Sequence, residues 1–148
     1  MRQRVEVTIV RPPAMVFDFI AREHWQNHPR WDSNVIEIIP LAHTPIQAGS
    51  RARVRRKRNP GDEVVEVLEF EPNQRWVSRT QIGPLSLVMT ALIEPANPGA
   101  SRLTLIGDTQ APTPMRYLLP ALALIFHRQM RTSLERIKQM VETETPRP

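Results

Sequence analysis

The sequence predicts an α+β domain in which a curved antiparallel sheet of about seven strands wraps around a long C-terminal helix, with an internal cavity between them. Three observations predict this fold. Seven segments alternate apolar and polar side chains with a period of two, which is typical of half-buried strands. Six of these segments follow one another through short connections, as in an antiparallel meander. The C-terminal segment instead carries a broad apolar stripe at helical spacing, and a sheet must curl around such a helix to bury both apolar faces.

The first strand is followed by a short helical region. Residues 3–10 alternate, and their apolar face is formed by Val5, Val7 and Ile9. Two prolines follow at positions 12 and 13, and they suit the first turn of a helix because its N–H groups have no partner within the helix. Residues 13–22 are therefore predicted to form a short amphipathic helix, and residues 24–30 to add another turn or two.

The meander begins after this helical region. Its predicted strands are residues 34–42, 50–58, 63–71, 74–81, 85–94 and 101–110. The connections at residues 59–62, 71–73, 82–84 and 95–100 each contain Pro, Gly or Asn, the residues that turns require. Short connections of this kind join neighbouring antiparallel strands.

The C-terminal segment is predicted to form one long helix from Pro114 to about Glu142, bent at Pro120. Its apolar stripe consists of Leu118, Leu122, Ile125, Phe126, Met130, Leu134, Ile137 and Val141. The last residues, 144–148, are predicted to form a frayed end.

Length and composition predict one domain spanning residues 1–148, with a core of ordinary size. Apolar residues make up 41% of the chain and charged residues 24%, and no run approaches the ~18 apolar residues of a membrane span. The start of the chain alternates, unlike a signal peptide, so the default expectation is a cytoplasmic location. The sequence contains no cysteine, which excludes disulfides and thiolate chemistry. Its five glycines form no nucleotide-binding motif, and no cofactor is expected.

Alternation also predicts which side chains face the helix. On the strands these are Val54, Val65, Val67, Leu87, Met89, Ala91, Leu103 and Leu105, and on the helix Leu118, Leu122, Phe126 and Met130. One interpretation is that they line a cavity for an apolar ligand, for which flexible methionines are well suited. The alternative is that they fill an ordinary core.

A polar cluster precedes the meander and contains His24, His28 and Asp32 beside Trp25 and Trp31. An imidazole with a pKa near ~6.5 can act as a general acid or base, and an aspartate can orient it. The alternative is a set of surface polar groups with Trp31 packed as an anchor. The two histidines have metal-ligand spacing on a helix, but without a third ligand we expect no metal site.

Two further aromatic residues are candidates for the same cavity. Trp76 is predicted either to line the cavity or to pack on the surface. Tyr117 is the only tyrosine of the chain, and its hydroxyl is expected near the cavity mouth.

Residues 51–58 contain six basic residues. A hairpin around residues 59–62 would place Arg58 opposite Glu63, Arg55 opposite Glu66 and Val54 opposite Val67. Such ion pairing favours a solvated hairpin over a nucleic-acid-binding patch, which remains an alternative.

Within this hairpin, Arg56 shares a face with Ala52 and Val54. Its guanidinium is therefore predicted to point inward, where it could pair with a ligand carboxylate.

Several motifs together resemble the SRPBCC superfamily of START-like, helix-grip proteins, in its polyketide cyclase/dehydrase-like branch. The first strand and helix match at Val7, Ile9, Arg11, Pro12, Pro13, Val16, Phe17 and Ile20. The pair Trp31 and Asp32, the turn at 45–50, EFEPNQR at 69–75 and LERIKQMVE at 134–142 follow in the same order. The chain departs from the pattern at Ala100 and Ser101, where many relatives have Gly-Thr.

The resemblance implies a seven-stranded sheet gripping the C-terminal helix, with an apolar cavity that opens near the short helices. Proteins of this kind bind lipids, sterols, polyketides, plant hormones or isoprenoid quinones, and some are aromatase/cyclases. We therefore expect a module that binds an apolar small molecule. The alternatives are a cyclase or dehydratase using acid-base chemistry in the same cavity, and a ribosome- or RNA-associated protein. Either a monomer or a homodimer is compatible with the exposed edges of such a sheet.

Overall fold

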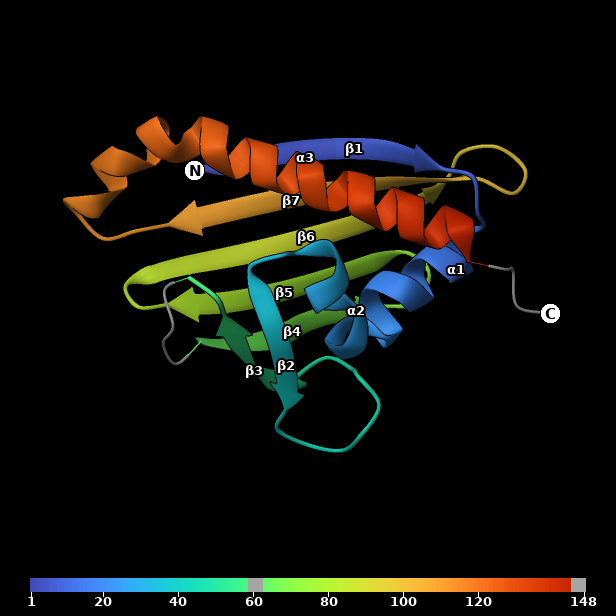
Figure 1. The fold of residues 1–148 in the computed structure, drawn as a ribbon, viewed down its shortest axis with the longest axis horizontal. Helices are drawn as coiled ribbons and strands as arrows, with labels where there is room; N and C mark the ends of the chain where they lie inside the picture. Colours follow the sequence, from blue (N-terminus) through green and yellow to red (C-terminus); the bar gives the residue numbers. More distant parts are fainter. Residues whose placement is uncertain (59–62, 145–148) are drawn as a thin grey trace.

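The computed structural model describes residues 1–58 and 63–144, which form an antiparallel seven-stranded sheet and several helices (Figure 1). The strands are β1 (Arg2–Ile9), β2 (Val35–Pro40), β3 (Arg51–Arg56), β4 (Glu63–Glu71), β5 (Arg75–Ile82), β6 (Leu85–Pro95) and β7 (Ser101–Gln110). The helices are α1 (Pro13–Phe17), the π-helical turn η1 (Asp18–Arg22), α2 (His24–Trp31), the 3-10 turn η2 (Met115–Leu118) and α3 (Leu119–Thr143). The predicted order of elements is confirmed.

The strands lie in the order β1-β7-β6-β5-β4-β3-β2, so the first two strands of the chain form the two edges of the sheet. Figure 1 shows α3 running along β1 and β7 on one face of the sheet, with α1 and α2 on the same side, α1 near the end of α3 and α2 beside β2. The sheet curves around these helices, and the predicted helix-grip architecture is confirmed.

One face of the sheet carries the core, and strand register identifies it because residues paired directly across two strands share a face. Trp76 pairs with Ala91, and Ala91 pairs with Leu105. Along the same face, Val65 pairs with Ala52 on β3. All eight strand residues that were predicted to face the helix lie on this inner face. They are Val54, Val65, Val67, Leu87, Met89, Ala91, Leu103 and Leu105.

The predicted bend at Pro120 is wrong. The segment before it forms the separate 3-10 turn η2, and α3 begins only at Leu119. Pro120 therefore lies in the first turn of α3, where a missing N–H costs no hydrogen bond. The prediction of a frayed end concerns residues 144–148, and of these residues 145–148 lie outside the described part of the chain.

The predicted register of the basic hairpin is also wrong. In the structure Val54 pairs with Glu63 and Arg51 with Glu66, so β3 is displaced by four residues relative to the predicted pairing. A displacement by an even number keeps each side chain on its face, and for this reason the inward direction of Val54 and Arg56 was predicted correctly. The loop at 59–62, from which the register was predicted, lies outside the described residues.

Candidate functional site

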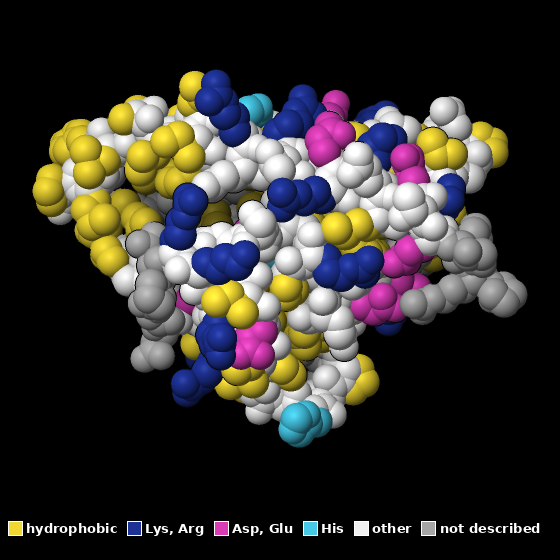
Figure 2. All heavy atoms as spheres, in the orientation of Figure 1, with side chains coloured by type: hydrophobic (Ala, Val, Ile, Leu, Met, Phe, Trp, Pro, Cys, Tyr) yellow, Lys and Arg dark blue, Asp and Glu magenta, His cyan; other side chains and the backbone are white. Residues whose placement is uncertain are grey.

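The inner face of the sheet is closed at one end and open at the other. Ala91, Ile93 and Leu103 are buried against the helices. Further along the same face, Leu87 and Met89 are only half-buried. Figure 2 shows a hollow beneath the start of α3, at the left of the view, with hydrophobic side chains inside it. The sheet and α3 therefore do not close on each other at this end.

The predicted wall residues follow this division. On the strands, Val54, Val65, Val67, Ala91, Leu103 and Leu105 are buried, whereas Leu87 and Met89 are half-buried. On α3, Phe126 and Met130 are half-buried. A Cβ atom added to Gly107 on β7 would lie 3.3 Å from Sδ of Met130 and 3.7 Å from Cε of Met89. The side chains of both methionines therefore lie next to this glycine, one from α3 and one from the sheet.

Two residues predicted to face the cavity are placed otherwise. Tyr117 is 67% exposed and Leu118 is 61% exposed. Both belong to η2, whose tighter winding removes them from the face that Phe126 and Met130 share. The guanidinium of Arg116 lies 5.3 Å from the centre of the Tyr117 ring, on the molecular surface.

Leu122 lies one turn into α3 and is also exposed. Residues 122 and 125 lie on the side of α3 that carries Arg136 three to four turns later. Arg136 donates a hydrogen bond to the carbonyl oxygen of Trp31 on α2, at 3.5 Å. This side of the helix therefore reaches α2 at Arg136 and is exposed at Leu122 and Ile125.

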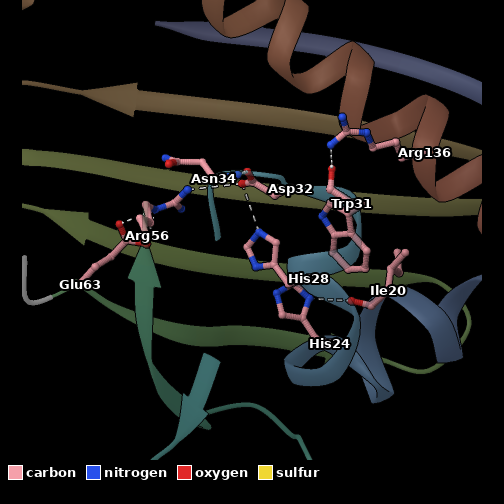
Figure 3. A network of polar contacts seen from close by, with 9 residues as sticks. All are labelled: Ile20, His24, His28, Trp31, Asp32, Asn34, Arg56, Glu63 and Arg136. Carbon is pink, nitrogen blue, oxygen red and sulfur yellow. Dashed lines mark hydrogen bonds and ion pairs between the residues drawn. The ribbon is translucent and has the colours of Figure 1, made fainter. Parts of the chain in front are cut away.

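A polar network borders the inner face beside β3 and β4 (Figure 3). Nε of Arg56 donates to both carboxylate oxygens of Glu63, at 2.8 and 3.0 Å. Nη1 of Arg56 donates to Oδ2 of Asp32 at 3.3 Å, and Oδ1 of Asp32 accepts from the backbone amide of Asn34. The side chains of Arg56 and Glu63 are 17% and 6% exposed, so this is a largely buried ion pair.

The charged groups of this network stabilise one another's ionised forms. Burial alone would lower the pKa of Arg56, but Glu63 and Asp32 together raise it above its ordinary value. Burial likewise opposes ionisation of Asp32, yet His28, the amide of Asn34 and Arg56 lower its pKa to about 2. The guanidinium is thus already neutralised by protein carboxylates, and its inward position alone does not leave it free for an acidic ligand.

The two histidines of α2 lie one turn apart, with ring centres separated by 4.9 Å. Nε2 of His28 lies 3.6 Å from Oδ2 of Asp32, close enough for an ion pair when the imidazole is protonated. Nδ1 of His28 is buried and has no hydrogen-bond partner within residues 1–58 and 63–144. This nitrogen is therefore a buried polar atom that the described residues leave without a hydrogen bond.

His24 lies deeper than His28. Its Nδ1–H donates to the carbonyl oxygen of Ile20 at 2.7 Å, and its ring stacks on Trp76 with a centre-to-centre distance of 4.5 Å. Burial, followed by the charge of His28, lowers the pKa of His24 to about 3. The ring is therefore neutral at physiological pH. Trp76 is buried, which decides between the two predicted roles in favour of an interior position.

Sequence reasoning missed two residues of this site. Glu63 was predicted to pair with Arg58 in a solvated hairpin, but it shares the inner face with Val65 and Val67 and pairs with Arg56. The alternation of β4 already contained this signal. Arg136 carried no comparable signal, because its bond to Trp31 depends on how α2 and α3 pack.

The basic run is paired with acidic side chains along β3. Arg55 contacts Glu37 at 2.8 Å, and Arg51 lies 4.0 Å from Glu66. These contacts use partners other than the predicted ones but have the predicted effect of neutralising part of the run. Elsewhere, a groove of about 580 Å³ lies between Pro13, the turn at 71–75 and the end of β6, and no candidate residue lines it.

Comparisons with known proteins bear on the fold around this site. Residues 2–142 match the sequence model of a family described as polyketide cyclase/dehydrase and lipid transport. The crystal structure of Ara h 8.0201 aligns with 97% of this chain and 99% of its own, with a TM-score of 0.75 and 12% identity. The protein TTHA0849 from Thermus thermophilus aligns with 95% of this chain and 97% of its own, with a TM-score of 0.72 and 15% identity.

A third structure is the di-domain ARO/CYC BexL from the BE-7585A biosynthetic pathway, which has a TM-score of 0.71 and 16% identity. It aligns with 96% of this chain, which in turn covers 46% of that protein. No protein of curated function matches the sequence. At these identities, the structural likeness shows a shared fold.

Proposed function

Because the chain belongs to the polyketide cyclase/dehydrase and lipid transport family, we propose that it binds an apolar small molecule between the inner face of the sheet and the first half of α3. A lipid, a polyketide or an isoprenoid has the required character. One observation carries the proposal: apolar side chains on β6 and on α3 point toward the same space but remain half-buried or exposed. A ligand would bury this surface, which favours binding by about 25 cal/mol for each Å² removed from water.

The proposed wall consists of residues that lie at or beside the open end, with Trp31 at its rim. These are Leu87, Met89, Leu122, Phe126 and Met130, and the buried residues Val54, Val65, Val67, Trp76, Ala91, Leu103 and Leu105 form its floor. Methionine side chains adapt to different apolar shapes, which suits ligands of several kinds.

The polar network supports a preference for a neutral polar end on the ligand. Arg56 is bound by Glu63 and Asp32, so the three residues together carry one net negative charge. A ligand carboxylate would meet this negative charge and is disfavoured. A hydroxyl or phenol can instead donate to Nδ1 of His28 or to a carboxylate oxygen. We therefore revise the sequence-based hypothesis that Arg56 pairs with an acidic ligand.

The first experiment is native mass spectrometry of freshly purified protein, in which we expect a retained apolar molecule. Calorimetric titration with dodecanol and dodecanoate then compares two ligands that share an alkyl chain and differ in charge. We expect tighter binding of dodecanol. Absence of binding for both compounds and for any retained molecule would contradict the proposal, and tighter binding of dodecanoate would contradict the preference for a neutral end.

A matched pair of variants localises the binding. Met89→Trp places a large ring in the proposed space, whereas Ile39→Trp adds the same ring to an exposed position of β2 that pairs with Arg53 on the outer face. We expect dodecanol affinity to fall at least about tenfold in Met89→Trp only, because the indole occupies volume that the alkyl chain requires. Equal affinities in the two variants would place the ligand elsewhere.

A second candidate function is acid-base catalysis of ring closure or dehydration in the same space. The observation favouring it is that His28, Asp32 and Arg56 meet in one network at the edge of the hollow, with His24 behind them. In this candidate His28 is the base and Asp32 orients its ring. A synthetic poly-β-ketone thioester, which cyclises spontaneously to several products, provides the test. A product distribution that is unchanged by the protein, or changed equally by His28→Asn, would remove this candidate.

A further inference from the structure

The start of the C-terminal helix gathers most of the exposed large apolar side chains of the described chain. Ten such side chains are exposed, and six of them form what we call the apolar patch: Met115, Tyr117, Leu118, Leu122, Leu124 and Ile125. Figure 2 shows hydrophobic atoms gathered at the upper left, over η2 and the first turns of α3. Contiguous exposed apolar surface of this kind marks an interaction site more often than scattered single residues do.

The chain segment that carries the patch has charges of one sign. The sequence from Thr109 to Leu134 contains no Asp or Glu but includes Arg116, Arg128 and Arg131. None of the ion pairs formed by residues 1–58 and 63–144 involves Arg116 or Arg128. The arginines therefore accompany the apolar residues as cations whose charge is not cancelled locally.

We propose that the apolar patch docks onto the surface of an anionic phospholipid bilayer. Apolar side chains enter the boundary between head groups and acyl chains, and arginines pair with phosphates at the same depth. Each basic residue near an anionic surface adds attraction that salt weakens. None of the helices in the described part of the chain combines the length and the apolar composition of a membrane-spanning segment.

The charge pattern also distinguishes this partner from a second copy of the chain. A symmetric dimer through the patch would bring the same arginines toward one another without any acidic residue between them. An anionic lipid surface instead complements them. The patch adjoins the hollow, so docking would place the opening against a reservoir of apolar molecules. The docking itself does not depend on the proposed ligand.

Co-sedimentation with vesicles tests the proposal, using phosphatidylcholine alone or mixed with phosphatidylglycerol. We expect binding to the mixed vesicles, and a marked loss when NaCl is raised from about 0.05 to about 0.5 M. The double variant Leu118→Ser/Leu124→Ser should bind at least about tenfold more weakly, because two side chains no longer enter the bilayer. The control Ile36→Ser/Ile39→Ser removes two exposed apolar residues from β2, outside the apolar patch, and should bind as the parent protein does.

Charge reversal by Arg116→Glu/Arg128→Glu should abolish the preference for the mixed vesicles, and circular dichroism verifies that each variant is folded. Three results would overturn the proposal: no binding of the parent protein, equal loss in the β2 control, or equal binding to neutral and mixed vesicles. A fourth result that would overturn the proposal is a dimer of the parent protein, detected by sedimentation velocity, that is lost in the variant Leu118→Ser/Leu124→Ser. Unchanged dodecanol binding by Leu118→Ser/Leu124→Ser would show that docking on the bilayer and ligand binding are independent of each other.

Discussion

The two halves of α3 belong to one continuous helix but have opposite surroundings. In the second half, Leu134, Ile137 and Val141 are almost completely buried against the sheet. Hydrogen bonds connect this half to the end of β1, for example from Nζ of Lys138 to the carbonyl oxygen of Thr8 at 2.7 Å. In the first half, Leu122, Leu124 and Ile125 remain exposed.

The difference shows how one helix can both hold the fold together and leave an opening. Burial of the second half stabilises the folded chain, and helical hydrogen bonding extends the ordered backbone beyond the packed region. The first half therefore presents apolar side chains on a defined scaffold without covering them. Four measurements test this difference between the two halves of the helix.

The largest loss of stability is expected when a buried side chain in the packed half of α3 is shortened. Leu134→Ala should lower the free energy of unfolding by about 3 to 4 kcal/mol, because Leu134 has no exposed surface and its removal leaves a cavity. Leu122→Ala makes the same chemical change in the open half and should cost less than about 1 kcal/mol. Urea unfolding followed by circular dichroism measures both values. Similar losses in the two variants would contradict this difference.

The second measurement tests whether the ion pair between Arg56 and Glu63 contributes to stability. Arg56→Met leaves Glu63 buried without its partner and should cost about 2 to 3 kcal/mol, a value reduced by the partial exposure of the pair. Arg55→Met removes an exposed pair with Glu37 and should cost less than about 0.5 kcal/mol. The double variant Arg56→Met/Glu63→Gln should recover part of the loss. No recovery would mean that the guanidinium acts mainly through packing.

A fall in pH is expected to lower the free energy of unfolding by about 2 kcal/mol through His24. Its pKa is about 3 in the folded protein and near 6.5 when unfolded, so the unfolded chain takes up the proton first. The contribution is fully present above pH 6.5 and is lost toward pH 3, by about 2 kcal/mol between pH 6.5 and 5.

Asp32, whose pKa falls from 3.8 to about 2, loses its contribution only at lower pH. Unfolding of the parent protein and of His24→Phe at several pH values isolates the histidine. A pH slope that is the same in both proteins would contradict a buried neutral His24.

The smallest effect concerns the boundary between the halves. Gly107→Ala adds a Cβ atom 3.3 Å from Sδ of Met130 and should change the free energy of unfolding by less than about 1 kcal/mol, because the thioether end can move. The added methyl group narrows the proposed space, so dodecanol affinity should fall slightly. A loss as large as that of Leu134→Ala would extend the packed region to this point.

The faces of the strands could be predicted from the sequence, because alternation determines direction without knowledge of pairing. Leu87 and Leu103 were placed on the inner face for this reason. The same logic predicted that Arg56 points inward even though the hairpin register was wrong by four residues. The wrapping of the sheet around the helix was predicted from the apolar stripe of the C-terminal segment, and the resemblance to the family implied the same architecture.

The contacts between the side chains of the site could not be predicted in the same way. The ion pair of Arg56 with Glu63 and Asp32 joins a strand, its neighbour and the end of a helix, so it depends on tertiary packing. The exposure of Leu118 depends on where the 3-10 turn gives way to α3, and a helical stripe cannot locate this transition. The bulge between Val67 and Glu69 likewise interrupts a pattern that looked regular.

The packing around His24 has an optical consequence. The sequence contains three tryptophans, and the rings of Trp25, Trp31 and Trp76 lie with their centres 5.4, 5.4 and 4.5 Å from that of His24. All indole fluorescence of the protein therefore arises next to one imidazole at the inner end of the polar network. Changes in emission intensity or wavelength would report on this region alone, so the natural chain carries its own label for following occupancy, protonation and local opening.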